Sequence, residues 1–322
     1  MTGGAPSAAG VAGANSPPSP PPPPSEDGEA WLYLPKRAPA SPLPPVIVMA
    51  HGIGGQKEMG LHGFASKFAD AGLAAFVIDY RTFGGSGGEP RHWASPARHV
   101  DDVVAAARYV KDALKDKVDV GKIALWGSSL AGGHVLAAGA RLGGDVAAIV
   151  SQVPHLSGPA ASRNNLRTRG PLGVARLALA GLHDVARTLS GRGPAYVTLA
   201  GRVGDLAFMQ LADDELAEYF SKHPKDGYAG GWQNRVRARF ALEIARYSPG
   251  RKLADTTCPV LLVLAKRDTQ CPPGVGRDLA ASVGPRVRVV ELDAAHFEVY
   301  RGAHFEAAVA AETAFLREVL AV

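Results

Sequence analysis

The chain has 322 residues, of which 46% are hydrophobic and 20% are charged, and its formal net charge at pH 7 is +5. This length allows one large α/β domain with an insertion or two ordinary domains, and it is ample for an apolar core. No run reaches the ~18 apolar residues of a membrane span, and the first 30 residues lack the basic start and apolar centre of a secretory signal.

The arginines are scattered along the chain, with one denser patch at Arg163, Arg167 and Arg169. No aromatic residues interleave with this patch, so the pattern is typical of a solvated face rather than of a nucleic-acid site. We therefore expect no nucleic-acid partner and no membrane partner.

The two cysteines, Cys258 and Cys271, bracket a predicted strand. At about 3.3 Å per residue, that strand holds their Cα atoms much farther apart than the ~6 Å that a disulfide allows. Two free thiols indicate a reducing compartment, and we expect a cytoplasmic protein.

Residues 1–28 consist mainly of Ala, Gly, Ser and Pro, with a proline run from Pro17 to Pro24 that only Ser19 interrupts. Such a segment buries too little apolar surface to offset the entropy of ordering it. The composition predicts a disordered arm with polyproline-II character.

Residues 29–155 alternate between short apolar runs and segments with helical spacing. The strands are predicted at Trp31–Leu34, Val46–Ala50, Ala74–Asp79, Ile123–Trp126 and Val146–Val150. The helices are predicted at 57–71, 100–115 and 130–141. Strands that read as continuous apolar runs between helices are typical of a parallel sheet covered on both faces.

The alternation stops after Val153 and resumes near Pro259, with roughly 100 residues between them. This insertion, residues 156–256, is expected to be a mainly helical cap, with helices at Val174–Leu189, Asp213–Lys222 and Asn234–Tyr247. Residues 257–322 then complete the core with strands at Val260–Leu264 and Val287–Leu292 and helices at Arg277–Val283 and 304–320. We predict an α/β fold with a mostly parallel, doubly wound sheet.

The sharpest motif is Gly127-Ser128-Ser129-Leu130-Ala131, which lies between a predicted buried strand and a helix. Small residues flank the central serine, and Gly132 and Gly133 follow. A strand, a tight turn and a helix in immediate succession are typical of a nucleophile elbow, which lifts a serine hydroxyl above the sheet. Ser129 is the predicted nucleophile.

Two further residues follow later strands. Asp268 comes four residues after the run that ends at Leu264, and His296 comes four residues after Leu292. Both side chains should emerge at the carboxyl edge of the sheet, where open α/β sheets hold their sites. The chain order serine, aspartate, histidine is that of the α/β-hydrolases.

On these motifs the chain resembles an α/β-hydrolase over about residues 31–322. It is similar to the dienelactone-hydrolase-like and S15 peptidase-like group, and within it to the thiohydrolases and polyketide transferases of fungal pathways. The segments that carry this resemblance are His51–Lys57, Asp79–Arg81, Gly84–Arg91, Trp126–Ser129 and His296–Phe297. The family usually begins with a strand hairpin, and only the run at residues 31–34 corresponds to it here.

The resemblance implies a Ser129–His296–Asp268 catalytic triad with no cofactor. In such a triad the imidazole takes the proton of the serine hydroxyl, and the buried carboxylate holds the imidazole tautomer. The residue after the nucleophile, Leu130, and a residue of the loop after the first strong strand, Ile53, would donate backbone N–H groups to the oxyanion. No histidine spacing indicates a metal site.

Other readings stay open for several residues. Ser128 competes as the nucleophile, His304 as the base and Asp293 as the acid, while His51 is interpreted as a loop-shaping residue. Aromatic side chains of the insertion line an acyl pocket or form its core, namely Phe208, Phe220 and Trp232.

The expected activity is cleavage of a small-molecule ester or thioester with an apolar acyl group through an acyl-Ser129 intermediate. An acyltransferase or an S15-type peptidase would use the same three residues. A non-catalytic binding protein would have no need of all three. The sequence leaves a homodimer open.

Overall fold

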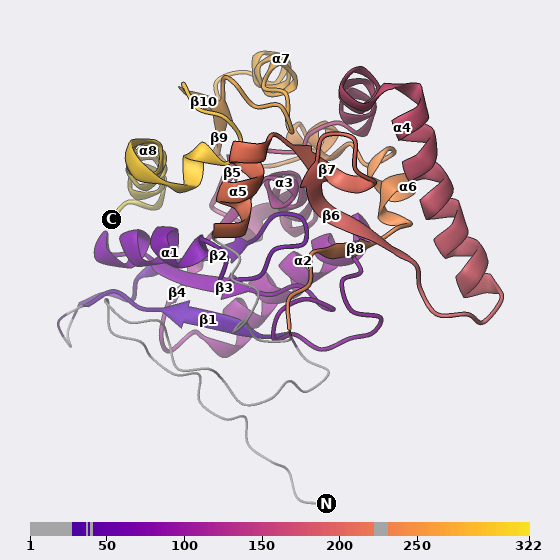
Figure 1. Ribbon diagram of the computed structural model, residues 1–322. Coiled ribbons are helices and arrows are strands. Elements are labelled where there is room, and N and C mark those ends of the chain that lie inside the picture. Colours follow the sequence, from indigo (N-terminus) through magenta and orange to yellow (C-terminus); the bar gives the residue numbers. More distant parts are fainter. Residues whose placement is uncertain (1–27, 37, 39–40, 222–230) are drawn as a thin grey trace, which may run out of the picture.

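The computed structural model describes residues 28–36, 38, 41–221 and 231–322, so the predicted proline-rich arm lies almost wholly outside the described residues. A seven-stranded sheet, of order β1-β3-β2-β4-β5-β9-β10, forms the centre of the molecule (Figure 1). Its strands are β1 (Ala30–Tyr33), β2 (Pro45–Ala50), β3 (Ala74–Ile78), β4 (Asp119–Ser128), β5 (Ala148–Gln152), β9 (Val260–Ala265) and β10 (Val287–Leu292). Only β1 is antiparallel to its neighbour, so the predicted mostly parallel sheet is confirmed.

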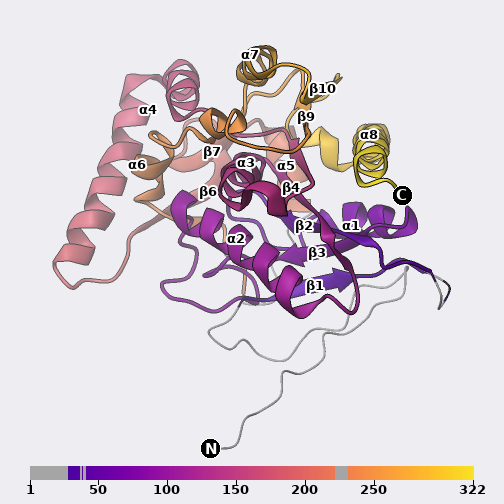
Figure 2. The same ribbon diagram turned by 180° about the vertical axis from the view of Figure 1, so that it is seen from behind.

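Helices cover both faces of the sheet because its central strands are apolar on both sides. All six residues of β2 are buried: Ile47 and Met49 belong to one hydrophobic core, and Val46 and Val48 belong to the other. Helices α1 (Leu61–Asp70) and α8 (Gly302–Leu320) pack into the first core. Helices α2 (Pro96–Ala113), α3 (Leu130–Leu142) and α7 (Gly274–Val283) pack into the second, and Figure 2 shows α2 and α3 side by side in front of the sheet. Short 3-10 turns span Gly143–Asp145, Pro249–Leu253 and Glu298–Tyr300.

The insertion between β5 and β9 contains more strand than the sequence predicted. Its helices are α4 (Gly158–Leu189), α5 (Asp213–Ser221) and α6 (Phe240–Ile244). Strands β6 (Tyr196–Arg202), β7 (Ala207–Leu211) and β8 (Arg235–Arg237) form a second sheet of order β7-β6-β8. The predicted helix over 234–247 is therefore wrong in its first part, because the chain there pairs with β6 and buries Val236.

Helix α4 bends at Gly170, which has φ 69° and precedes Pro171. Near this bend Arg169, expected on a solvated face, donates hydrogen bonds to the carbonyl oxygens of Ala207 and Phe208 in β7. The bend separates two straight helical segments, of which the second runs along one edge of the molecule (Figure 1). Within the described part of the chain, no helix has the length and apolar character to cross a bilayer.

A buried ion cluster holds the insertion together. The Asp184 carboxylate of α4 accepts hydrogen bonds from Arg237 Nε at 3.0 Å, Arg239 Nε at 2.7 Å and the Ala195 N–H at 2.9 Å. Burial alone would raise the pKa of Asp184, but the Ala195 N–H and the two guanidinium groups lower it below its ordinary value. The cluster joins α4 to β8 and to the start of α6.

We expect Asp184→Ala to lower the free energy of unfolding by about 3–5 kcal/mol, because it leaves buried guanidinium groups without their carboxylate. Urea denaturation at pH 7 measures this loss. The lowered pKa means that Asp184 stabilises the fold above its ordinary pKa, and that this contribution is lost as the pH falls through the folded-state pKa. The difference between wild type and variant should therefore shrink in acid.

The control for this change is Asp255→Ala. Its partner is Lys252 at 2.8 Å, and both side chains are more than half exposed, so the loss should be about 1 kcal/mol or less. Equal losses from the two variants would show that the Asp184 cluster is no more than a surface ion pair.

Candidate active site

Ser129 lies at the sharp turn between β4 and α3, with φ 59° and ψ −119°. Small residues are needed around it for steric reasons. A Cβ atom at Gly127 would lie 2.3 Å from the Ala131 carbonyl oxygen, and one at Gly132 would lie 2.7 Å from Pro154 Cβ. The strained backbone of Ser129 thus occurs where the surrounding packing leaves no alternative, as at many functional sites.

The structure brings Ser129, His296 and Asp268 together at the carboxyl edge of the sheet. His296 Nε2 lies 3.0 Å from Ser129 Oγ, and His296 Nδ1 lies 2.7 Å from Asp268 Oδ2. The other carboxylate oxygen, Oδ1, accepts the N–H groups of Gln270 at 2.8 Å and Cys271 at 2.7 Å. Asp268 follows β9 and His296 follows β10, as the sequence predicted.

This arrangement favours a single tautomer of His296. A carboxylate can only accept from Nδ1, so Nδ1 carries the proton and Nε2 is left to accept the Ser129 hydroxyl proton. The aspartate and the histidine are 7% and 2% exposed, so bulk water does not compete for these bonds. Chemically, the group can deprotonate the serine hydroxyl and stabilise the imidazolium that results.

Backbone donors lie beside the serine. Leu130 is the first residue of α3, so its N–H has no partner within the helix. The loop after β2 comes close on the other side, since a Cβ atom at Gly52 would lie 3.1 Å from Ser129 Cβ. Ile53, the other predicted donor, is the next residue of this loop.

His51 and Trp232 hold the loop in place. His51 Nδ1 lies 2.9 Å from the Gly52 carbonyl oxygen, and burial lowers the pKa of His51, so the neutral ring donates this hydrogen bond. That carbonyl shares a peptide plane with the Ile53 N–H, so the bond fixes the direction of the N–H. From the insertion, the Trp232 indole donates to the Gly54 carbonyl oxygen at 2.8 Å.

We expect Gly52→Ala to lower kcat by about 10²-fold while the protein stays folded, because the new methyl group lies 3.6 Å from Ser129 Oγ and displaces the loop or the substrate. Gly144→Ala is the matched control, since a Cβ atom there meets nothing within 4 Å. Steady-state kinetics and melting temperatures of both variants test this. Full activity of Gly52→Ala would mean that the close approach of this loop to Ser129 is not needed for the reaction.

The competing residues lie elsewhere or are already engaged. The Ser128 hydroxyl is buried, accepts a hydrogen bond from Gln152 Nε2 at 3.0 Å and lies 2.5 Å from the Tyr300 hydroxyl. His304 belongs to the first turn of α8. Asp293 is exposed and pairs with Arg267.

Cys271 is a neighbour of the site that sequence reasoning did not include. Its Sγ lies within 4.8 Å of a carboxylate oxygen of Asp268 and of a ring nitrogen of His296. The thiol is also hydrogen-bonded with Ser129. Burial and the Asp268 charge raise its pKa well above the ordinary value, so the thiol stays protonated. Its position three residues after Asp268 was the only sequence signal for this closeness.

A row of aromatic rings leads from the insertion to the imidazole. Ring centroids are 6.5 Å apart for Trp232 and Tyr219, 5.7 Å for Tyr219 and Phe297, and 5.0 Å for Phe297 and His296. Phe208, by contrast, packs on Phe240 at 4.7 Å inside the insertion. The side chain of Phe220 is outside the described part of the chain.

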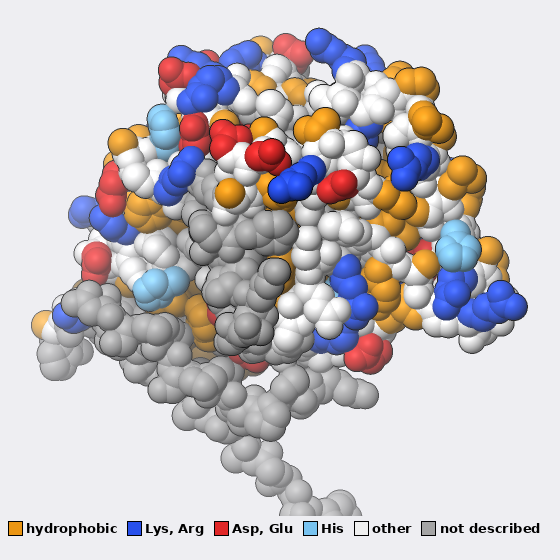
Figure 3. Space-filling view, in the orientation of Figure 1, with side chains coloured by type: hydrophobic (Ala, Val, Ile, Leu, Met, Phe, Trp, Pro, Cys, Tyr) orange, Lys and Arg blue, Asp and Glu red, His pale blue; other side chains and the backbone are white. Residues whose placement is uncertain are grey.

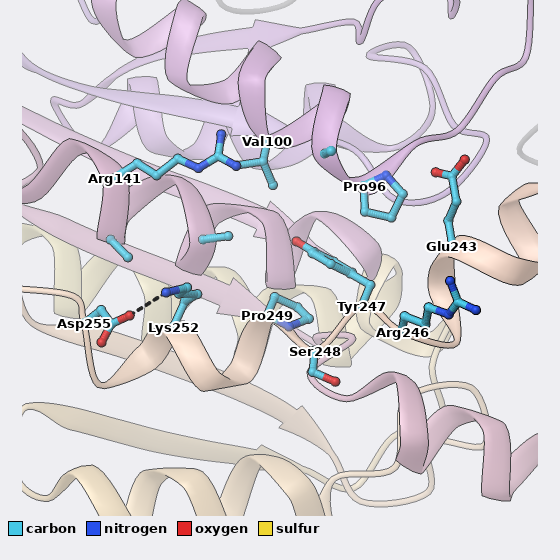
Figure 4. A pocket seen from close by; sticks show the side chains of 13 residues that line it. Pro96, Val100, Arg141, Glu243, Arg246, Tyr247, Ser248, Pro249, Lys252 and Asp255 are labelled. Atoms are coloured by element: carbon cyan, nitrogen blue, oxygen red, sulfur yellow. Dashed lines mark hydrogen bonds and ion pairs between the residues drawn. The ribbon is translucent and has the colours of Figure 1, made fainter.

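A cavity of about 600 Å³ lies apart from Ser129, between α2, α3 and the end of the insertion (Figure 4). Tyr247 projects into it, and the tyrosine hydroxyl lies 2.7 Å from His134 Nδ1. Burial lowers the pKa of His134 to about 3, so this imidazole is neutral. The cavity contains none of the predicted site residues.

The mostly parallel sheet, the strained serine between strand and helix, and the acid and histidine after later strands define an α/β-hydrolase. The chain belongs to the hydrolase family described as "Serine aminopeptidase, S33", which matches residues 42–297. The resemblance to α/β-hydrolases inferred from the motifs is thereby confirmed.

Several relatives cover nearly the whole chain. The chain is 35% identical to "Quorum-quenching protein AidA" of Acinetobacter baumannii over 91% of both chains. It is 27% identical to "Polyketide transferase af380" of Aspergillus fumigatus, over 90% of this chain and 93% of the relative, and 24% identical to "Thiohydrolase aneE" of Aspergillus aculeatus, over 86% of both. The predicted likeness to thiohydrolases and polyketide transferases is confirmed.

Solved structures share the fold. The α/β hydrolase GrgF from Penicillium sp. sh18 superposes with a TM-score of 0.74 at 21% identity, over 92% of this chain and 95% of that one. At this identity the likeness establishes the fold alone.

Proposed function

We propose that the protein hydrolyses an ester or thioester through an acyl-Ser129 intermediate. The observation that carries the proposal is the hydrogen-bonded series Ser129 Oγ, His296 and Asp268, at 3.0 Å and 2.7 Å. Membership of a hydrolase family with a relative named as a thiohydrolase supports it.

The reaction proceeds in two halves. His296 Nε2 takes the hydroxyl proton as Ser129 Oγ attacks the acyl carbon, and the N–H groups of Leu130 and Ile53 stabilise the oxyanion. His296 then returns the proton to the leaving alcohol or thiol, and the acyl-serine remains. Water, deprotonated by His296, attacks the acyl-serine, which releases the acid and restores the hydroxyl.

We propose further that the insertion, residues 156–256, is a cap that forms the binding pocket for an apolar acyl group. The aromatic row of Trp232, Tyr219 and Phe297 supports this, because it joins the insertion to His296 and places the half-buried ring of Phe297 next to the imidazole. The free thiols of Cys258 and Cys271 support the expected cytoplasmic location.

The test compares a series of p-nitrophenyl esters with acyl chains of increasing length, a thioester and a matching amide. We expect turnover of the ester and thioester that rises with acyl length, and slower turnover of the amide. Adding an alcohol acceptor at low millimolar concentration should leave the free acid as the main product.

Two results would change the assignment. Transfer product in excess of free acid would make the protein an acyltransferase, which the relative named as a polyketide transferase makes the second candidate. Faster turnover of the amide than of the ester would make it a peptidase.

A further inference from the structure

The second segment of α4 exposes a row of leucines. After the bend at Gly170, residues 171–189 form a helix about 28 Å long. Leu172, Leu179, Leu182 and Leu189 are 73%, 64%, 55% and 85% exposed. Figure 3 shows hydrophobic side chains along the right edge of the molecule, where α4 runs in Figure 1. A contiguous apolar surface of this kind marks an interaction site.

The spacing of the row fits a partner helix. With the exposed residues Ala175 and Ala186, the row reads Leu172, Ala175, Leu179, Leu182, Ala186, Leu189, at intervals of three and four residues. This is the 3.5-residue period by which two helices pack along a straight seam. The buried residues Leu177, Gly181 and Asp184 face the opposite way, so the fold of one chain does not use the row.

We propose that this row, here called the leucine row, is the contact surface of a two-fold symmetric dimer in which the α4 helices of two copies pack antiparallel. The order Leu-Ala-Leu-Leu-Ala-Leu reads the same in both directions, and so do its intervals. A two-fold axis between Leu179 and Leu182 therefore sets leucine opposite leucine and alanine opposite alanine in every layer.

A cleft at the end of the leucine row can hold Leu189, the most exposed leucine, of the second copy. In the antiparallel register Leu189 of one copy lies at the height of Leu172 of the other. Beside Leu172 is a cleft of about 260 Å³, whose lining includes Val203 and Leu206, themselves 69% and 39% exposed. The cleft would receive Leu189 of the second copy at each end of the seam.

The charges beside the row distinguish a second copy from an anionic lipid surface. Arg176, His183 and Arg187 share one flank of the helix, and the two-fold axis brings the same flank of both copies together. Salt screens the repulsion between the Arg176 and Arg187 guanidinium groups of the two copies, so added salt should strengthen the dimer but weaken binding to anionic lipid. Binding to a lipid surface would also not require a row whose residues and intervals read the same in both directions.

The first test measures mass in solution by light scattering and sedimentation, from about 1 to 100 µM protein. We expect a dimer whose dissociation constant falls as NaCl rises from 50 to 500 mM. The double variant Leu179→Glu, Leu182→Glu should be monomeric throughout while it stays folded, whereas Val289→Glu, at an exposed position of β10, should remain dimeric. A wild-type monomer at every concentration would overturn the proposal.

The second test fixes the register by disulfide cross-linking. Ala175→Cys and Ala186→Cys, mixed and oxidised, should give a cross-linked dimer, because the two positions face each other across the antiparallel seam. Each variant alone should not, because identical positions lie about 16 Å apart along the axis. Cross-linking of either variant alone would refute the antiparallel register.

The third test uses vesicles of phosphatidylglycerol and phosphatidylcholine. Wild-type protein should not sediment with them. A monomer that sediments with them at 50 mM NaCl, and loses this binding in the Leu179→Glu, Leu182→Glu variant, would replace the second copy by a lipid surface. The substitutions at Leu179, Leu182 and Val289 lie outside the proposed catalytic group. Ester turnover of these variants therefore tests the proposed function independently of the dimer.

Discussion

Ser129→Ala is expected to lower ester turnover by about 10⁴-fold or more and to abolish labelling by a fluorophosphonate. The variant lacks the oxygen that is proposed to attack the acyl carbon, while the proposed backbone donors at Leu130 and Ile53 remain. The change removes only one hydroxyl group, so the melting temperature should change little. Hydrolysis rates, intact-protein mass spectrometry of the labelled enzyme and thermal unfolding measure these three effects.

Ser128→Ala is the control that the chain itself offers. The Ser128 hydroxyl is engaged with Gln152 and Tyr300, so its loss should lower turnover by no more than about tenfold and leave fluorophosphonate labelling intact. Labelling that survives Ser129→Ala but disappears in Ser128→Ala would show that Ser128, and not Ser129, is the nucleophile.

The core sheet could be predicted because its strands are buried on both faces. Runs such as Val260–Leu264 have no polar residue, so burial and strand structure are encoded locally, and the observed β9 (Val260–Ala265) differs by one residue. The positions of Asp268 and His296 follow from the same signal, since parallel strands bring the residues after their carboxyl ends to one edge.

The second sheet could not be predicted in the same way. Strand β6 mixes buried, half-buried and exposed residues, and β8 has three residues, two of them arginines. Such segments become strands because they pair with one another across some 40 residues of chain, and composition contains no sign of that pairing. Local propensity favoured a helix over 234–247, and strand pairing overrode it at 235–237.

Contacts around the site that join distant segments were also beyond the sequence. Trp232 reaches the carbonyl of Gly54 from 178 residues away, and Tyr219 meets Phe297. Both contacts depend on how the insertion folds back over the sheet. From the sequence, Trp232 was expected either to line an acyl pocket or to lie in the core of the insertion. In the structure its side chain is buried against the loop after β2.

His296→Ala is expected to lower turnover as far as the serine change does, by about 10⁴-fold, because Ser129 then has no base within hydrogen-bonding distance. The Asp268 carboxylate would lose its 2.7 Å partner at His296 Nδ1 but keep the two N–H donors from Gln270 and Cys271. It is therefore not left without partners, and the protein should stay folded. Turnover and fluorophosphonate labelling rate should fall together, since both need an activated hydroxyl.

His304→Ala provides the comparison for the base. His304 lies in the first turn of α8, eight residues after His296, and both histidines stand in an Ala-His-Phe sequence. Its loss should change turnover by no more than a few-fold. If His304→Ala abolishes turnover while His296→Ala retains it, the base is His304, and the hydrogen bond between His296 and Ser129 has no catalytic role.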